Sequence, residues 1–235
     1  SEWEQFFNSE EKINYKFDTN SQDGFFPFRS ESAKDNPIKD LKEFFHVYPN
    51  TNLPNFLSKN TNLLYSELVS LGNTLLGWLD DLTPNNIKSE FSESLFNMSK
   101  GSDRNLLRVL HYPPVEGEVE QGAIRAAAHE DINLITLLVS GSQPGLEAMD
   151  MNGVWHKVPV DKGMITVNVG DMLQMASNKY FPSTSHRVVN PENSKQNVSR
   201  FSLPMFMHPR NEVILRSGIT AFDYLQERLK EINLK

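Results

Sequence analysis

The spacing of apolar positions divides the chain into a helical first part and a strand-rich second part. After Pro54, leucines recur at steps of three and four residues, which predicts a long amphipathic helix. These leucines are Leu64, Leu68, Leu71, Leu75 and Leu79. Residues 2–14 also have a helical pattern, and residues 23–37 predict a loop because they are rich in Gly, Pro, Ser and Asn. Another helix is expected to begin with Thr83 as N-cap and Pro84 as its first residue.

From Asn105 onward the pattern changes to short apolar runs separated by Gly, Pro and Asn, which is typical of strands. The expected strands are 105–112, 132–139, 145–150, 164–169, 172–176, 185–189 and 199–207, with a tight turn at Gly170-Asp171. Many short strands without intervening helices favour a β-sandwich or a jelly-roll barrel over an alternating α/β fold. The chain then closes with a helix, for which Thr220 is the expected N-cap and Asp223 the N3 residue.

Composition narrows the class of protein. With 235 residues, 38% of them hydrophobic and 23% charged, the chain resembles an ordinary soluble globular protein of one domain. The net charge of −7 argues against nucleic acid as a partner, because phosphate binding requires a basic face. No apolar run approaches the length of a membrane helix, and the charged start lacks a signal-peptide core. The absence of cysteine excludes thiolate sites and fits a cytoplasmic location.

The stretch "RAAAHEDINLITLLVSG" places a histidine and two carboxylates at the start of an apolar run. Side chains two apart on a strand share a face, so His129 and Asp131 should point together while Glu130 points away. Such a pair begins a metal site of the type in which two histidines and one carboxylate bind Fe(II). By itself, however, His-x-Asp is a weak signal, and a structural histidine is the simpler interpretation.

Other catalytic motifs do not fit. The sequence His129-Glu130 suggests H-E-x-x-H, but Asn133 stands where the second histidine is needed. A zinc deaminase requires cysteines, and Ser142 lacks the flanking pattern of a nucleophile elbow.

A second histidine and an unusual arginine occur further along the chain. His186 begins a short apolar strand in "STSHRVVNP", and Arg200 and Ser202 lie two apart in "VSRFSLPMFMHP". An arginine that points into an apolar barrel is costly unless it meets an anion, and its planar fork suits a carboxylate.

The ordered set of H-x-D, a distant His and R-x-S resembles the isopenicillin N synthase-like group of Fe(II)/2-oxoglutarate-dependent dioxygenases. Flanking stretches agree with that group, among them "LLRVLHYPP", "ITVNVGDMLQMASNKYFPSTSHRVVNP" and "RFSLPMFMHP". The resemblance is dense over residues 105–210 and looser upstream. It implies that His129, Asp131 and His186 are the iron ligands.

The resemblance also implies a cosubstrate site. Arg200 and Ser202 match the pair that holds the distal carboxylate of 2-oxoglutarate, and Tyr112 matches a tyrosine that supports the cosubstrate. The asparagine that the family places two residues before this tyrosine is Leu110 here, so one polar contact is replaced by an apolar side chain.

The fold implied by the resemblance is mainly β with flanking helices: a double-stranded β-helix, or jelly roll, supported by a long helix. Residues 1–235 are expected to form a single oxygenase domain. Within it, 1–104 would be mostly helical support and pocket border, 105–210 the jelly-roll core, and 211–235 a C-terminal helix. The N-terminal section of the family is expected to be absent from this chain.

The implied reaction uses Fe(II), 2-oxoglutarate and O2, with ascorbate as a stimulant. It couples oxidative decarboxylation of 2-oxoglutarate to succinate with oxidation, foremost hydroxylation, of a small-molecule substrate. Two alternatives stay open: an oxidase of the same fold that does not use 2-oxoglutarate, and a binding module without catalysis. The sequence specifies neither the primary substrate nor the oligomeric state.

Overall fold

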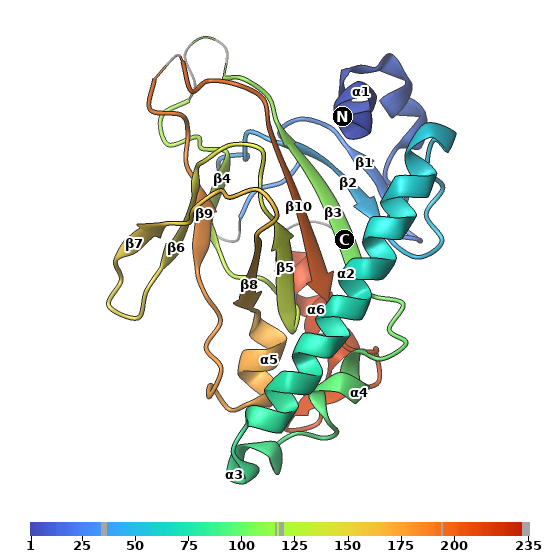
Figure 1. Ribbon diagram of the computed structural model, residues 1–235, viewed down its shortest axis with the longest axis vertical. Coiled ribbons are helices and arrows are strands. Elements are labelled where there is room, and N and C mark those ends of the chain that lie inside the picture. The colour runs from blue at the N-terminus through green and yellow to red at the C-terminus, as the bar shows by residue number, and fades with distance from the viewer. Residues whose placement is uncertain (34–36, 116, 118–119, 194, 232–235) are drawn as a thin grey trace.

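The computed structural model describes residues 1–33, 37–115, 117, 120–193 and 195–231. Two antiparallel sheets form its centre (Figure 1). A cavity between them, called the inner cavity below, is lined by residues of both sheets. The major sheet has the order β1-β2-β3-β10-β5-β8, with bounds Gly24–Phe26, Glu43–Val47, Leu106–Tyr112, Arg200–Met207, Ile135–Val139 and Ile165–Val169. The minor sheet has the order β4-β9-β6-β7, with bounds Ala126–His129, His186–Val188, Leu146–Met149 and Trp155–Lys157. This arrangement confirms the expected jelly-roll fold, mainly β with flanking helices.

Helices surround these sheets. Their bounds are α1 Glu2–Asn8, α2 Asn55–Leu82, α3 Asn85–Lys88, α4 Leu95–Ser99, α5 Asp171–Ala176 and α6 Ala221–Glu231, with a 3-10 helix at Glu10–Tyr15. Helix α2 runs along the major sheet and contacts β10 and β5 (Figure 1). It comes so close that a Cβ on Gly72 would lie 2.6 Å from the sulfur of Met207. The long amphipathic helix expected from the leucine spacing is therefore confirmed, and it supports the β core.

The apolar core has two parts. The larger lies between α2, α1 and the major sheet, where Trp3, Phe6 and Phe45 make edge and tilted ring contacts at centroid distances of 5.4–5.5 Å. The smaller cluster contains residues from both sheets, such as Leu110 of β3 and Val188 of β9. Because this second cluster joins the two sheets, it also forms the apolar wall of the cavity between them.

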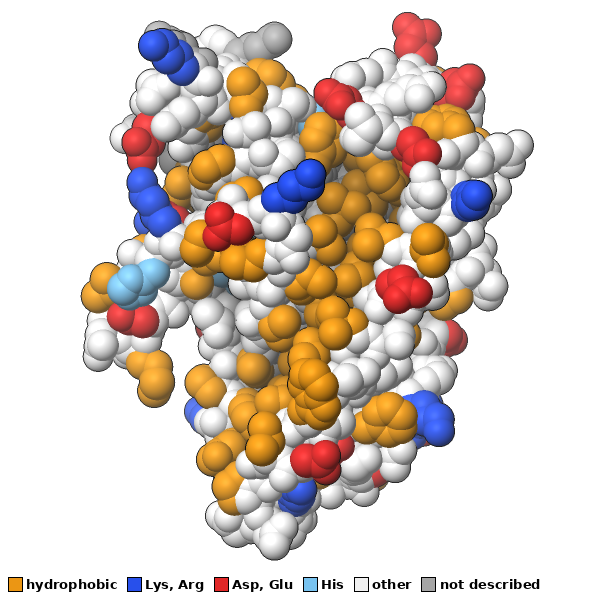
Figure 2. All heavy atoms as spheres, in the orientation of Figure 1, with side chains coloured by type: hydrophobic (Ala, Val, Ile, Leu, Met, Phe, Trp, Pro, Cys, Tyr) orange, Lys and Arg blue, Asp and Glu red, His pale blue; other side chains and the backbone are white. Residues whose placement is uncertain are grey.

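Figure 2 shows the same face of the molecule as Figure 1 with all side chains in place. Apolar side chains gather along the middle of this face, and charged side chains are scattered around them. The ionisable residues of the candidate site lie between the sheets instead, in the cavity described below.

The expected strand at 172–176 is wrong, because these residues belong to helix α5. Gly170 is the N-cap of this helix, and the buried positions are Met172, Leu173 and Ala176. That spacing of one and three residues places the buried side chains on one side of a helix, not on alternate faces of a strand. A short apolar run does not by itself distinguish the two structures.

The first 104 residues are less helical than expected. Strands β1 and β2 arise from this part and extend the major sheet beside β3. All five residues of β2 are buried, so the strand shows no alternation that would reveal it. The helix expected over 2–14 is divided at Ser9, which caps both α1 and the following 3-10 helix. Thr83 is not an N-cap: it ends α2, and its hydroxyl donates to Leu79 O.

The other expected elements are confirmed within a few residues at each end. Strands β3, β5, β6, β8, β9 and β10 lie where the apolar runs predicted them. The hydroxyl of Thr220 accepts from the backbone N–H of Asp223 at 3.1 Å, so the expected N-cap of α6 is present. Among the described helices, none combines the length and the apolar character that a membrane crossing requires.

Candidate active site

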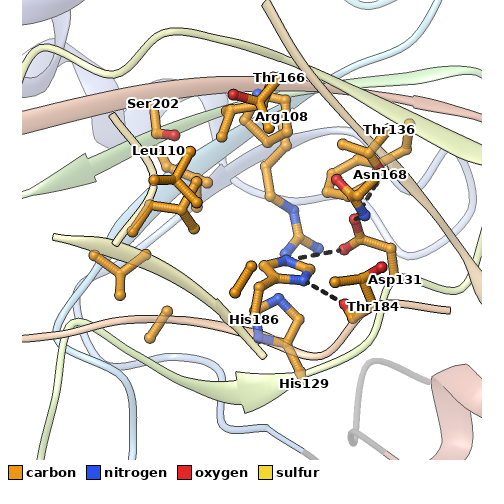
Figure 3. A pocket seen from close by; sticks show the side chains of 18 of the residues that line it. Arg108, Leu110, His129, Asp131, Thr136, Thr166, Asn168, Thr184, His186 and Ser202 are labelled. Carbon is orange, nitrogen blue, oxygen red and sulfur yellow. Dashed lines mark hydrogen bonds and ion pairs between the residues drawn. The ribbon is translucent and has the colours of Figure 1, made fainter. Parts of the chain in front are cut away.

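Two histidines from neighbouring strands of the minor sheet face each other. Strands β4 and β9 pair in antiparallel register with His129 opposite His186, and the ring centroids are 4.4 Å apart. Asp131 follows just after the end of β4. One nitrogen from each histidine and one oxygen of Asp131 lie within 4.8 Å of one another (Figure 3). His129 and Asp131 point together as expected, but the strand ends at His129, so a loop and not a shared strand positions the carboxylate.

Backbone carbonyls fix the tautomer of both imidazoles. His129 Nδ1 lies 2.7 Å from Ala127 O, and His186 Nδ1 lies 3.0 Å from Thr184 O. A carbonyl oxygen only accepts, so each Nδ1 must carry the proton and donate it. Each Nε2 therefore keeps a free lone pair, which is the form that binds a metal.

The carboxylate of Asp131 is oriented by two donors. Its Oδ2 accepts from Thr136 Oγ1 at 2.6 Å and from Asn168 Nδ2 at 2.9 Å. Its Oδ1 remains, 3.6 Å from His186 Nε2. Burial would raise the pKa of Asp131, but the histidines and these two hydrogen bonds outweigh it and lower that pKa. The carboxylate is therefore ionised, with one oxygen held and the other available.

The loop that positions Asp131 depends on a close contact with α5. A Cβ on Gly170 would lie 2.3 Å from Asn133 O, so only glycine fits there without a shift of the backbone. The next residue, Asp171, donates its N–H to Asp131 O at 2.7 Å. The turn between strands expected at Gly170-Asp171 is therefore wrong, because these residues begin a helix that holds the loop.

Two imidazole nitrogens and one carboxylate oxygen, all with free lone pairs and all converging, fit a ferrous ion. This donor set is the facial triad of non-haem Fe(II) oxygenases, which leaves coordination positions open for small molecules.

Replacement of Thr136 by valine is expected to weaken Fe(II) binding about 10- to 100-fold, because Asp131 loses the hydroxyl that orients it. Thr136→Ser should restore most of the affinity, since it keeps the hydroxyl. Anaerobic Fe(II) titration measures both. Thr74→Val is the matched control, because that hydroxyl bonds only to Ser70 O on α2. Wild-type affinity in Thr136→Val would contradict this role.

The inner cavity, about 90 Å³, extends from the triad to Arg200, Ser202 and Tyr112. Strands β10 and β3 pair so that Arg200 lies opposite Tyr112 and Ser202 opposite Leu110. All three residues expected at the cosubstrate site therefore share one cavity with the three expected metal ligands. Leu110 also lines this cavity, as an apolar side chain at the position where the family carries asparagine.

Arg200 is only 1% exposed and pairs with no acidic side chain of the described residues. Its Nε donates to Gln143 O at 3.0 Å, while its buried Nη1 has no hydrogen-bond partner among the residues that the structure describes. Burial lowers the pKa of Arg200, and Tyr112, whose ring centre is 5.2 Å from the guanidinium, opposes that effect. A buried cation without a counter-ion is costly, so this end of the cavity suits an anionic ligand.

Comparison with known proteins gives the same class of site. The sequence profile of the 2OG-Fe(II) oxygenase superfamily matches residues 103–209. The chain is 30% identical over 230 residues to the proline hydroxylase buaE of Petromyces alliaceus, a match that covers 84% of this chain and 70% of that protein. This chain belongs to the 2OG-Fe(II) oxygenase superfamily.

Solved structures of similar proteins support this membership. A candidate oxygenase from Shewanella oneidensis is 49% identical, with a TM-score of 0.86 over 98% of this chain and 83% of that one. A Neurospora crassa protein, solved in complex with alpha-ketoglutarate and thymine, is 25% identical with a TM-score of 0.76 over 97% of this chain and 80% of that one. Matches to two other curated 2-oxoglutarate oxidoreductases span 40% and 33% of those proteins, well under two thirds. Membership confirms the expected enzyme class and its cofactors, Fe(II) and 2-oxoglutarate.

Several residues of this oxygenase site were not predicted. Thr136 and Asn168 orient Asp131, and each is a polar residue inside an apolar strand, which was an available signal. Arg108 in "LLRVLHY" was another such signal, since it is a charge within a buried strand that lines the inner cavity. Lys42 also lines this cavity, and nothing local in its sequence indicated it.

Acidification is expected to destabilise the metal-free oxygenase well above the pH at which carboxylates protonate. Burial lowers the pKa of His208 to about 4, against about 6.5 in an unfolded chain. The unfolded state therefore binds more protons between these values, and stability falls as the pH falls. From pH 7 to pH 5, His208 alone should cost about 2 kcal/mol of unfolding free energy.

Urea unfolding of wild type and His208→Gln at both pH values, with a chelator present, measures this effect. The variant should lose about 2 kcal/mol less than wild type between pH 7 and pH 5. His129 contributes in the same direction in both proteins, because burial and His186 lower its pKa to about 4. An equal loss in the two proteins would show that His208 does not titrate as described.

Proposed function

We propose that this chain is an Fe(II)- and 2-oxoglutarate-dependent dioxygenase that hydroxylates a small molecule. The observation that supports it most is a single cavity with a metal triad at one end and, at the other, a buried arginine that has no acidic partner among the described residues. An organic dianion that binds a metal through one end and an arginine through the other fits this arrangement. In the proposed reaction, 2-oxoglutarate, O2 and a substrate C–H bond give succinate, CO2 and an alcohol.

The protein residues have separate tasks in this proposal. His129, Asp131 and His186 would hold the metal on one side, with the imidazole Nε2 atoms and Asp131 Oδ1 as ligand atoms. Iron bound there would supply the oxygen chemistry, as it does in non-haem oxygenases.

The cosubstrate would be held at the far end of the cavity. Arg200 and Ser202 would bind the distal carboxylate of 2-oxoglutarate, and Tyr112 would support it from the neighbouring strand. Apolar side chains such as Leu138 and Val188 line the walls between. They exclude water, which strengthens the pairing of the carboxylate with the guanidinium.

A small-molecule substrate is proposed from the relatives and from the cavity. The Neurospora crassa structure contains thymine, and the relative buaE is named for proline hydroxylation. A second cavity of about 630 Å³ reaches the triad and has room for a molecule of this class. We also propose that residues 1–235 form one oxygenase domain. The cytoplasmic location stays a prediction, which cell fractionation would check.

The test is O2 uptake with Fe(II), 2-oxoglutarate and ascorbate, with succinate measured in the same reaction over a panel of small molecules. We expect one succinate for each substrate oxidised. Substrate oxidation without succinate would replace this proposal with an oxidase that does not use 2-oxoglutarate. Failure to bind Fe(II) under anaerobic conditions would favour a binding module without catalysis.

A further inference from the structure

The second cavity, of about 630 Å³, is called the outer cavity below, and its lining shows which side chains lie beside the metal triad. It shares five residues with the inner cavity: Lys42, Arg108, His129, Asp131 and Phe206. Neither Arg200 nor Ser202 lines it. In Figure 3 the side chain of Arg108 extends toward His186 and Asp131. If the proposed function holds, a molecule oxidised at the triad lies against Arg108, Lys42 and Phe206.

Arg108 is held rigidly on this wall. Its Nε donates to His46 Nε2 at 2.9 Å, and its Nη1 donates to Glu31 Oε2 at 3.2 Å. His46 can accept because its Nδ1 carries the proton and donates to Gln22 O at 3.1 Å. The guanidinium also lies 4.6 Å from the ring centre of Phe44. No described residue accepts from Nη2, so its N–H groups are left for a ligand.

The charge of Arg108 is already balanced. Glu31 Oε2 also lies 2.7 Å from Lys42 Nζ, which in turn lies 2.8 Å from Asp40 Oδ2. Burial would raise the pKa of Glu31, but Arg108 and Lys42 outweigh it and hold that pKa below its usual range. Burial would likewise lower the pKa of Lys42, but Glu31 and Asp40 raise it. Two cations and two carboxylates therefore form a neutral cluster.

The two arginines of the site differ in this respect. Arg200 has no described acidic partner, so its positive charge favours an anionic ligand. The charge of Arg108 is balanced by Glu31, so Arg108 can donate hydrogen bonds to a ligand without adding net charge to the site. With the metal in place, its two positive charges and the charge of Arg200 balance the Asp131 carboxylate and a 2-oxoglutarate dianion, so no positive charge is left over beside Arg108. A substrate carboxylate placed there would be buried without a counter-ion, which is costly.

We propose that the primary substrate is bound beside the metal through a neutral carbonyl oxygen, of the amide, imide or lactam type, that accepts from Arg108 Nη2. A substrate carboxylate at this position is selected against. Phe206, whose ring centre lies 5.7 Å from the Arg108 guanidinium, provides an apolar face beside the carbonyl. The neutral cluster therefore sets the substrate class and Arg200 sets the cosubstrate class, because an acidic side chain balances the charge of Arg108 and no described one balances that of Arg200.

The test uses matched probes that differ only in charge. Benzamide and benzoate, nicotinamide and nicotinate, and thymine and 5-carboxyuracil are titrated into the Fe(II)- and 2-oxoglutarate-loaded chain without oxygen. Binding is measured by calorimetry or by ligand-observed NMR. We expect the neutral member of each binding pair to bind at least about tenfold more tightly than the acid. Tighter binding of the acids, or no binding by any neutral probe, would overturn the proposal.

Two variants test separately the hydrogen bond from Arg108 and the charge balance of the cluster. Arg108→Met should weaken the neutral probes about tenfold or more, while Arg210→Met, at an exposed ion pair, should not. Glu31→Gln removes one negative charge from the cluster, so the acids should gain about tenfold relative to the neutral probes. Glu120→Gln, at an exposed pair with Arg29, is its control. An unchanged preference in Glu31→Gln would show that charge balance does not set the selectivity.

The same titrations separate this proposal from the proposed function. If the wild-type chain does not bind Fe(II) and 2-oxoglutarate, the oxygenase assignment fails. If it binds both and forms succinate, yet prefers the acid probes, only the substrate class is wrong. Circular dichroism of each variant checks that the fold is intact.

Discussion

Replacement of His186 by alanine is expected to abolish Fe(II) binding at equilibrium and to reduce 2-oxoglutarate turnover about a thousandfold or more. A thousandfold loss corresponds to about 4 kcal/mol of transition-state stabilisation. The physical reason is that His186 Nε2 is one of the three converging ligand atoms that the described residues place in this site. The remaining His129 and Asp131 cannot fix the metal geometry alone. Anaerobic Fe(II) titration and succinate formation measure the two effects.

The matched control is His156→Ala. His156 lies on β7 with its side chain 60% exposed, and it pairs with Asp150 at 2.8 Å. We expect this variant to bind Fe(II) as wild type does. If His186→Ala also kept one tight Fe(II) site per chain, the assignment of the triad would be wrong.

Replacement of Arg200 by glutamine is expected to weaken 2-oxoglutarate binding about 150-fold, or about 3 kcal/mol, while Fe(II) affinity stays unchanged. The guanidinium is the buried cation at the end of the cavity opposite the metal, and glutamine keeps a polar side chain but removes the charge. Calorimetry of 2-oxoglutarate with the metal-loaded protein gives the affinity. Arg200→Lys should recover part of it, since the charge returns without the planar fork.

Arg210→Gln is the control for the loss of an arginine. Arg210 pairs with Glu93 and Glu212 near the surface and lines neither of the two cavities. An exposed pair of this kind contributes about 0.2–1 kcal/mol and should not change cosubstrate affinity. Equal 2-oxoglutarate affinity in wild type and Arg200→Gln would mean that the cosubstrate is held elsewhere.

Much of the fold could be predicted because hydrophobic periodicity is a local property. Helix α2 and strands β3, β5 and β10 follow from their apolar spacing alone. The errors occurred where local pattern was ambiguous. Residues 172–176 are too few for their periodicity to distinguish a helix from a strand, and they form helix α5 with Gly170 as its N-cap. Strand β2 is buried throughout, so it has no polar face to reveal it.

The candidate site divides in the same way. The roles of His129, Asp131, His186 and Arg200 were expected from the resemblance to the dioxygenases, and the structure brings these residues to one cavity. Motif spacing did not reveal how each side chain is oriented. The tautomers depend on the carbonyls of Ala127 and Thr184, and the free oxygen of Asp131 depends on two residues from other strands. Of these contacts only that of Asn168, 37 positions from Asp131, joins distant segments; the others are local but depend on backbone geometry that a motif does not specify.

The sequence by itself determined which residues carry chemistry, because side-chain type and spacing are written in it: two imidazoles, a carboxylate and an arginine in an ordered set. Only the tertiary structure decided which charged groups lie beside each arginine. Arg200 lacks a counter-ion among the described residues, while Arg108 gains one from Glu31, 77 positions away. Electrostatic balance depends on distances between charges, and those distances exist only once strands from both halves of the chain are packed together.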